Sequence, residues 1–161
     1  DSTISINSST FNRTIKVNED GTFSDTLKVD GEFYMLLHGN ARTIINLKNG
    51  YNLSFNFDSN DLLNTAKFSG SGAGTNEYMT AKMKLEDEYE LGNPGSFFEL
   101  EKSEFDKKIS VLSTKMEALL DNAQDLDSTF TAKEIENNNH FERWHQTMGQ
   151  CRWPDSWIIY R

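Results

Sequence analysis

The chain of 161 residues is short of cysteine, proline and basic residues. Its one cysteine, Cys151, excludes an internal disulfide framework and a Cys-x-x-Cys pair. No apolar run approaches the roughly 18 residues of a membrane-spanning helix, so we predict no membrane span. Only 16 residues are basic against 25 acidic ones, and the net charge of −9 disfavours binding to nucleic acid or to anionic lipid.

The first 69 residues carry the alternation that is typical of β-strands. In YNLSFNFD, residues 51–58, apolar and polar side chains alternate strictly, as in a strand that buries one face. The runs TFNRTIKV (10–17) and TFSDTLKV (22–29) alternate in the same way, whereas EFYMLLH (32–38) is apolar on both faces and predicts a central strand covered on two sides. Together with Gly-containing turns, the pattern predicts an antiparallel meander in a β-sandwich or open barrel of about six or seven strands.

After this region the period becomes helical. A helix from Asn76 to Leu91 has Tyr78 and Tyr89 on one face, and the turn LGNPG ends it. A second, long helix covers residues 97–123, and Asp127-Ser128 begins a third. The long helix carries an apolar seam that needs a partner helix or another chain: Phe98, Phe105, Ile109, Leu112, Met116 and Leu119. The fold class that we predict is therefore α+β.

A glycine-rich stretch, FSGSGAGTNEYM (68–79), joins the two regions. A turn between a strand and a helix directs free backbone N–H groups to a point where an anion can bind. However, the spacing is G-x-G-x-G, no Lys-Ser/Thr follows, and the stretch lies outside a βαβ unit. We therefore predict a structural joint, in which glycines turn the chain and Thr75 or Asn76 caps the new helix.

The other polar clusters match no recognised site. The acidic run Glu86 to Glu90 points around a helix, and Asp58 to Asp61 begins like a calcium loop but lacks its glycine and further oxygen ligands. His140, His145 and Cys151 do not have zinc-site spacing, and His38, at a strand end, is expected to serve the fold. The sequence thus predicts no catalytic residue, no metal ligand and no cofactor, and it leaves the binding residues open.

The order of the elements carries a resemblance. The turn NEDGTFSDTL, the run EFYMLLHGNARTIINLKNGYNLSFNFD, the stretch FSGSGAGTNEYM and the charged helices resemble the N-terminal domain of bacterial envelope thiol-disulfide interchange proteins, the TlpA/ResA-like group of the thioredoxin superfamily. The resemblance covers roughly residues 11–139. It implies a small β-rich domain, a glycine-rich turn and a helical connector before a thioredoxin domain. That domain's Cys-x-x-Cys pair is absent here, so none of its catalytic residues is carried over.

The last residues differ in composition from the rest. Residues 140–161 hold all three tryptophans and the cysteine, whereas the preceding residues are rich in Asn, Lys, Asp and Ser. Two interpretations stay open: a docking segment that buries its aromatic side chains, or a sequence that is not native to the family beyond Asn139. We favour the second. The predicted organisation is an antiparallel β-sandwich over residues 1–69, the glycine joint and helices over 70–139, and this atypical tail.

These observations predict a non-catalytic N-terminal accessory module of a periplasmic thioredoxin-like oxidoreductase, for substrate docking, positioning or self-association. The expected partner is a protein or the module's own thioredoxin domain, with a homodimer as an alternative. The implied location is the periplasm or cell envelope, with a lipid anchor on the full-length protein as one arrangement. The contending hypothesis is a stand-alone β-sandwich protein that binds carbohydrate or peptide.

Overall fold

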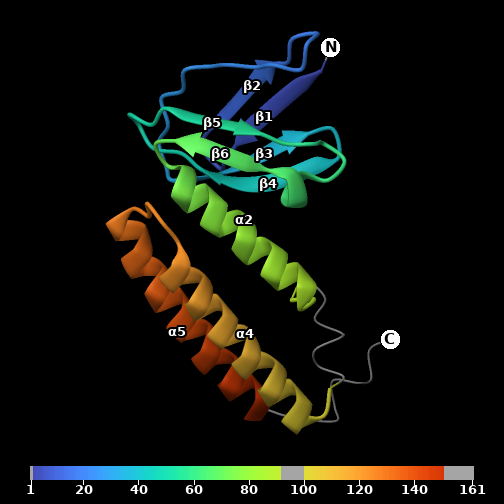
Figure 1. Cartoon of the computed structure of the whole chain (residues 1–161), viewed down its shortest axis with the longest axis vertical. Coiled ribbons are helices and arrows are strands. Elements are labelled where there is room, and N and C mark those ends of the chain that lie inside the picture. Colours follow the sequence, from blue (N-terminus) through green and yellow to red (C-terminus); the bar gives the residue numbers. More distant parts are fainter. Residues whose placement is uncertain (1, 92–99, 151–161) are drawn as a thin grey trace. The chain divides into compact units, whose positions relative to one another are not determined.

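The computed structural model describes residues 2–91 and 100–150, without the side chains of 142 and 144–150 (Figure 1). The chain forms two compact units. The sheet unit comprises Asp1–Lys84 and Ala123–Asp127, and the helical unit comprises Leu85–Asn122 and Ser128–Arg161. Cys151, Trp153 and Trp157 lie outside the described residues.

The sheet unit contains two antiparallel sheets (Figure 1). The first has four strands in the order β2-β1-β3-β4, and the second pairs β5 with β6. Their bounds are β1 Thr3–Asn7, β2 Asn12–Lys16, β3 Phe33–His38, β4 Ala41–Asn46, β5 Leu53–Asn56 and β6 Lys67–Gly70. The antiparallel strands and the α+β class are confirmed. The sandwich arrangement stays a prediction.

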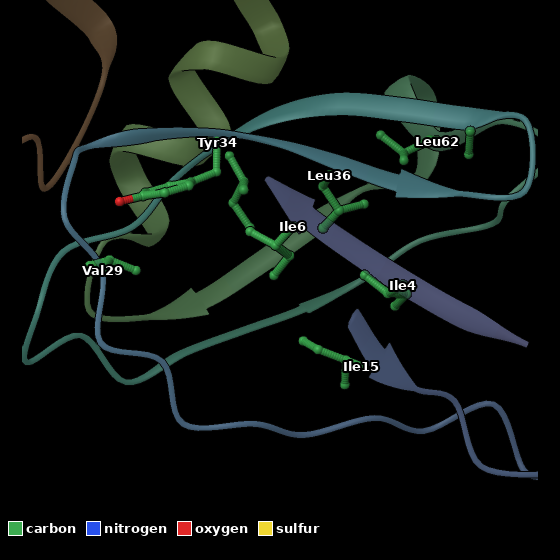
Figure 2. Packing of buried hydrophobic residues seen from close by; sticks show 9 residues of the cluster. Ile4, Ile6, Ile15, Val29, Tyr34, Leu36 and Leu62 are labelled. Carbon is green, nitrogen blue, oxygen red and sulfur yellow. The ribbon is translucent and has the colours of Figure 1, made fainter. Parts of the chain in front are cut away.

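The register of the larger sheet places most of its branched apolar residues on one face, with Ile44 exposed on the other. Directly paired residues point to the same side of a sheet, and here Ile4 pairs with Ile15 and Ile6 with Leu36. Tyr34 of β3 is buried on this face as well. Figure 2 shows these side chains converging on one core. Half-buried side chains of the second sheet and its flanks pack against the core, among them Leu53, Phe55, Phe57 and Phe68.

Two strand predictions are wrong. Residues 17–32, here called the strap, contain TFSDTLKV but form no strand, and β3 pairs with β1 across them, so the topology is not a sequential meander. Alternation determines which side chains face the core, but a strand also needs a neighbour in register. The run EFYMLLH is a central strand, yet its outer face is not covered, because Phe33 is 44% and Met35 38% exposed.

The helices of the described chain are α1 Leu62–Thr65, α2 Ala73–Glu88, α4 Lys102–Asn122 and α5 Ser128–Gln150. Three of them correspond to those that the sequence predicted, with shifted ends, and the short helix α1 was not predicted. In the helical unit α4 packs along α5 (Figure 1). Of the predicted seam, α4 buries Phe105, Ile109, Leu112 and Met116, but Leu119 is only half-buried and Leu120 is buried instead. Phe98 lies outside the described residues. The predicted start of the third helix at Asp127-Ser128 is confirmed, and most of the LGNPG turn lies outside the described residues. Within ranges 2–91 and 100–150 no helix is long and apolar enough to cross a membrane.

Candidate functional site

The glycine-rich stretch is a close-packed joint in the sheet unit. Gly70 and Gly72 have φ angles of +87° and +85°, which residues with a Cβ rarely adopt. A Cβ on Gly70 would meet the backbone carbonyl of Asn52, and one on Gly72 would meet the ring of Tyr51. Glycine is therefore required at both positions by backbone conformation and by space.

Asn76 ties the joint to the larger sheet. Its Oδ1 accepts a hydrogen bond from the backbone N–H of Asn46 at 2.8 Å, and its Nδ2 donates to the carbonyls of Asn46 and Gly72 at 3.0 and 2.9 Å. The side chain thus pairs with both backbone groups of the last residue of β4. The predicted capping role is wrong, because α2 already begins at Ala73 and both Thr75 and Asn76 lie inside the helix. Both are 1% exposed, so this end of α2 belongs to the core.

A second chain segment closes the joint from outside. Gly74 lies so near the carbonyls of Gln124 and Asp125 that a Cβ would clash with both. In the same segment the carboxylate of Asp127 lies 3.1 Å from Lys48 Nζ, which also pairs with Glu32 at 3.5 Å. Burial opposes the charge on Lys48, but these two partners outweigh it and raise its pKa. Packing and hydrogen bonds thus hold the joint in place from two sides.

The candidate site is a pocket of about 1110 Å³ in the sheet unit. Its volume is slightly above the usual range for ligand sites, roughly 300–1,000 Å³. It lies between the inner face of the larger sheet, the strap and the strand β5. The lining combines apolar side chains within and polar ones at the rim. Its floor is the buried core, namely Ile4, Ile6, Ile15, Val29 and Ile45. Its half-buried apolar lining comprises Val17, Phe23, Leu27, Leu47, Tyr51, Leu53, Phe55 and Phe57.

Aromatic side chains from the strap and from the second sheet meet in this pocket. The ring centroid of Phe23 lies 5.3 Å from that of Phe55, in an edge-to-face arrangement. Phe55 in turn stacks with Phe57 at 5.7 Å and with Phe68 at 5.8 Å. Such pairs add about 0.5–1.5 kcal/mol beyond the burial of their area. This cluster is half-buried, and three of its rings, Phe23, Phe55 and Phe57, line the pocket, whereas Phe68 does not.

The strap is held by side chains. The guanidinium of Arg13, on β2, donates two hydrogen bonds to the carboxylate of Asp25, at 2.5 and 3.0 Å. This charge-assisted pair lowers the pKa of Asp25 and raises that of Arg13. At the other end of the strap the Asn49 amide bonds both the N–H and the carbonyl of Val29, at 3.1 and 2.9 Å.

Most of the polar residues that the sequence analysis considered as site candidates do not line this pocket. His38 does line it, and its Nδ1 donates to the carbonyl of Thr3 at 2.9 Å, which confirms a role in the fold. Asp58 accepts from the N–H of Asn60 within its own turn. Among the described side chains no group of three or more His, Cys, Asp or Glu is placed to hold a metal ion.

Sequence reasoning did not find the pocket, because its walls are about thirty residues apart in the chain. The only signal was the shared alternation of TFSDTLKV and YNLSFNFD, which shows that both bury one face but not that they face each other. Comparison of the chain with protein-family models, with curated proteins and with solved structures finds no significant match in any of the three. The site therefore has to be interpreted from its own geometry.

Proposed function

We propose that this chain is a non-catalytic accessory module of a periplasmic thioredoxin-like thiol-disulfide oxidoreductase, and that it docks the protein substrate. The observation that carries the proposal is the large pocket with an aromatic wall in the sheet unit. A protein that still lacks its disulfides is incompletely folded, and it exposes apolar side chains that the native fold would bury. A pocket lined by aliphatic and aromatic side chains is suited to such segments.

The joint supports a positioning role for the same module. Because Asn76 bonds both backbone groups of Asn46, the first turn of α2 is fixed to the edge of the larger sheet. Anything held in the pocket is thereby fixed relative to this helix end. The resemblance of the sequence to the N-terminal domains of envelope interchange proteins supports the proposal that the chemistry occurs in a thioredoxin domain.

Docking is tested by the binding of an unfolded protein. We expect reduced, carboxymethylated α-lactalbumin, which cannot refold, to bind the chain, and native α-lactalbumin not to bind. The variant Phe23→Ser removes an aromatic ring from the pocket, and Phe33→Ser removes one from the exposed outer face of the larger sheet. Phe23→Ser should weaken binding at least tenfold, while circular dichroism confirms that it folds, and Phe33→Ser should not.

Three results would overturn this assignment. Equal binding of both forms of α-lactalbumin, or none, would remove docking as the function. Loss of binding in Phe33→Ser alone would move the contact to the outer face.

The non-catalytic part is tested by dithiothreitol-driven reduction of insulin, in which we expect the chain, Cys151→Ser and buffer to give equal rates. A rate above buffer that Cys151→Ser abolishes would make the chain an enzyme.

A further inference from the structure

The strand β5 has one edge that is not paired with the described part of the chain. In an antiparallel pair, successive residues direct their backbone groups alternately toward the partner and away from it. The carbonyl of Asn52 accepts a hydrogen bond from the N–H of Ser71, so the backbone groups of Asn52 point toward β6. Those of Ser54 and Asn56, two and four residues further on, point the same way. The N–H and carbonyl groups of Leu53 and Phe55 must therefore point to the opposite edge, where the strap runs.

The strap does not pair with this edge. In residues 23–28 no backbone group forms a backbone-to-backbone hydrogen bond with the described chain. Nevertheless residues 22–27 and 53–57 line the same pocket, and the rings of Phe23 and Phe55 touch across it. Two stretches of extended pattern thus flank the pocket with unpaired main chain, and such edges are templates for an added strand.

We infer that this pocket binds an extended peptide segment, which adds as a strand to the free edge of β5. This inference rests on the proposed docking function and specifies its ligand. Main-chain hydrogen bonds to Leu53 and Phe55 supply sequence-independent affinity, and every second side chain of the peptide enters the apolar pocket. We expect antiparallel pairing, as in all the other ladders of the sheet unit. Peptide residues opposite Leu53 and Phe55 then point their side chains to the pocket side.

The charge around the pocket selects among such peptides. Glu19 and Asp25 line it; the carboxylate of Asp25 is already paired with Arg13, whereas Glu19 forms no ion pair with the described residues. The cation on the lining, Lys48, is paired with two carboxylates, and the whole chain carries a net charge of −9. A segment with alternating apolar and basic residues is therefore the preferred ligand, and its affinity should fall with added salt.

The decisive measurement is amide hydrogen exchange, residue by residue, on the whole chain. The probe is the peptide Lys-Val-Lys-Phe-Lys-Val-Lys, and its control, Lys-Lys-Val-Phe-Val-Lys-Lys, has the same composition without alternation. In the free protein we expect slow exchange at Ser54 and Asn56, which pair with β6, and fast exchange at Leu53 and Phe55. The probe should slow exchange at Leu53 and Phe55 at least tenfold, and the control should not.

N-methylated probes test the pairing without altering the protein. N-methylation of the Val and Phe residues removes the donors that face β5 in the antiparallel arrangement, and it should abolish binding. N-methylation of the two inner Lys residues removes donors that face away, and binding should remain within about threefold, less than the change expected for one lost hydrogen bond. Equal effects of the two modifications would overturn strand addition.

Failure of this inference can be told from failure of the proposed function. If unfolded α-lactalbumin binds through Phe23 but neither it nor the probe protects Leu53 and Phe55, docking stands and strand addition is wrong. Slow exchange of these two amides in the free protein would show that the strap or a second copy already occupies the edge, which also overturns the inference. Binding of dodecanoate in preference to the probe would also overturn the inference, because it would show that the pocket binds acyl chains.

Discussion

Replacing Asn76 by alanine tests the joint most directly. The substitution removes three hydrogen bonds, two of which satisfy the N–H and carbonyl of Asn46, a residue that is 0% exposed. A typical hydrogen bond contributes about 1 kcal/mol net, and leaving buried partners unsatisfied costs more, so we expect the free energy of unfolding to fall by about 3–5 kcal/mol. Since whole domains are stable by only about 5–15 kcal/mol, this loss is severe.

Urea unfolding at pH 7, followed by circular dichroism, measures the effect. With a slope of about 2 kcal/mol per molar urea, the midpoint for Asn76→Ala should fall by about 2 M. Glu77→Ala, at the exposed neighbouring position, is the matched control and should change stability by less than about 0.5 kcal/mol. A loss below about 1 kcal/mol for Asn76→Ala would show that the amide does not hold the sheet to the helix.

The adjacent residue should respond in the opposite direction. Thr75 is as buried as Asn76, but its hydroxyl has no hydrogen-bond partner in the part of the chain that the structure describes. Thr75→Val keeps the shape and removes the buried polar atom, so stability should rise by about 1 kcal/mol in the same urea experiment. A loss of stability would indicate that a water molecule or another group satisfies this hydroxyl.

Three further predictions concern single side chains, each measured by urea unfolding. Gly70→Ala should lower the free energy of unfolding by more than about 2 kcal/mol, because it adds a backbone clash to a positive φ angle. Gly39 also has a positive φ angle but open space around it, so Gly39→Ala should lower it by only about 1 kcal/mol. Leu112→Ala, at a fully buried position, should cost about 2–5 kcal/mol, and exposed Val111→Ala little. The lowered pKa of Asp25 stabilises the fold above the unfolded value of about 3.9 and ceases to do so as the pH falls through the folded value. The variant Asp25→Asn should therefore be less stable than the wild type at pH 7, and this difference should shrink as the pH falls through the folded pKa.

Sequence patterns predicted the strands and helices in which the spacing of apolar residues alone determines the secondary structure. The alternation of YNLSFNFD yields β5, and the apolar spacing of α4 yields a buried seam, because each pattern produces an apolar face that must be covered. TFSDTLKV has the same alternation and buries Val29, yet it remains without a ladder. Strand pairing depends on a neighbour in space, which a local pattern does not contain.

The candidate site was less predictable than the fold, for a related reason. A polar residue soon after a glycine turn is usually a cap, so the bridge from Asn76 to a strand thirty residues earlier could not be foreseen. The pocket likewise arises only when Phe23 and Phe55 are brought together by the strap. Both features depend on long-range contacts between residues whose types are ordinary for their local surroundings.

The five residues Ala123–Asp127 have a practical consequence for anyone who shortens this chain. They belong to the sheet unit although α4 separates them from the rest of it. A fragment that stops at Lys84 would retain every strand and the pocket lining, but it would uncover Gly74 and leave Lys48 with Glu32 alone. To express the sheet unit as an independent fragment, residues 123–127 must therefore be joined to it again, for example through a short loop after α2.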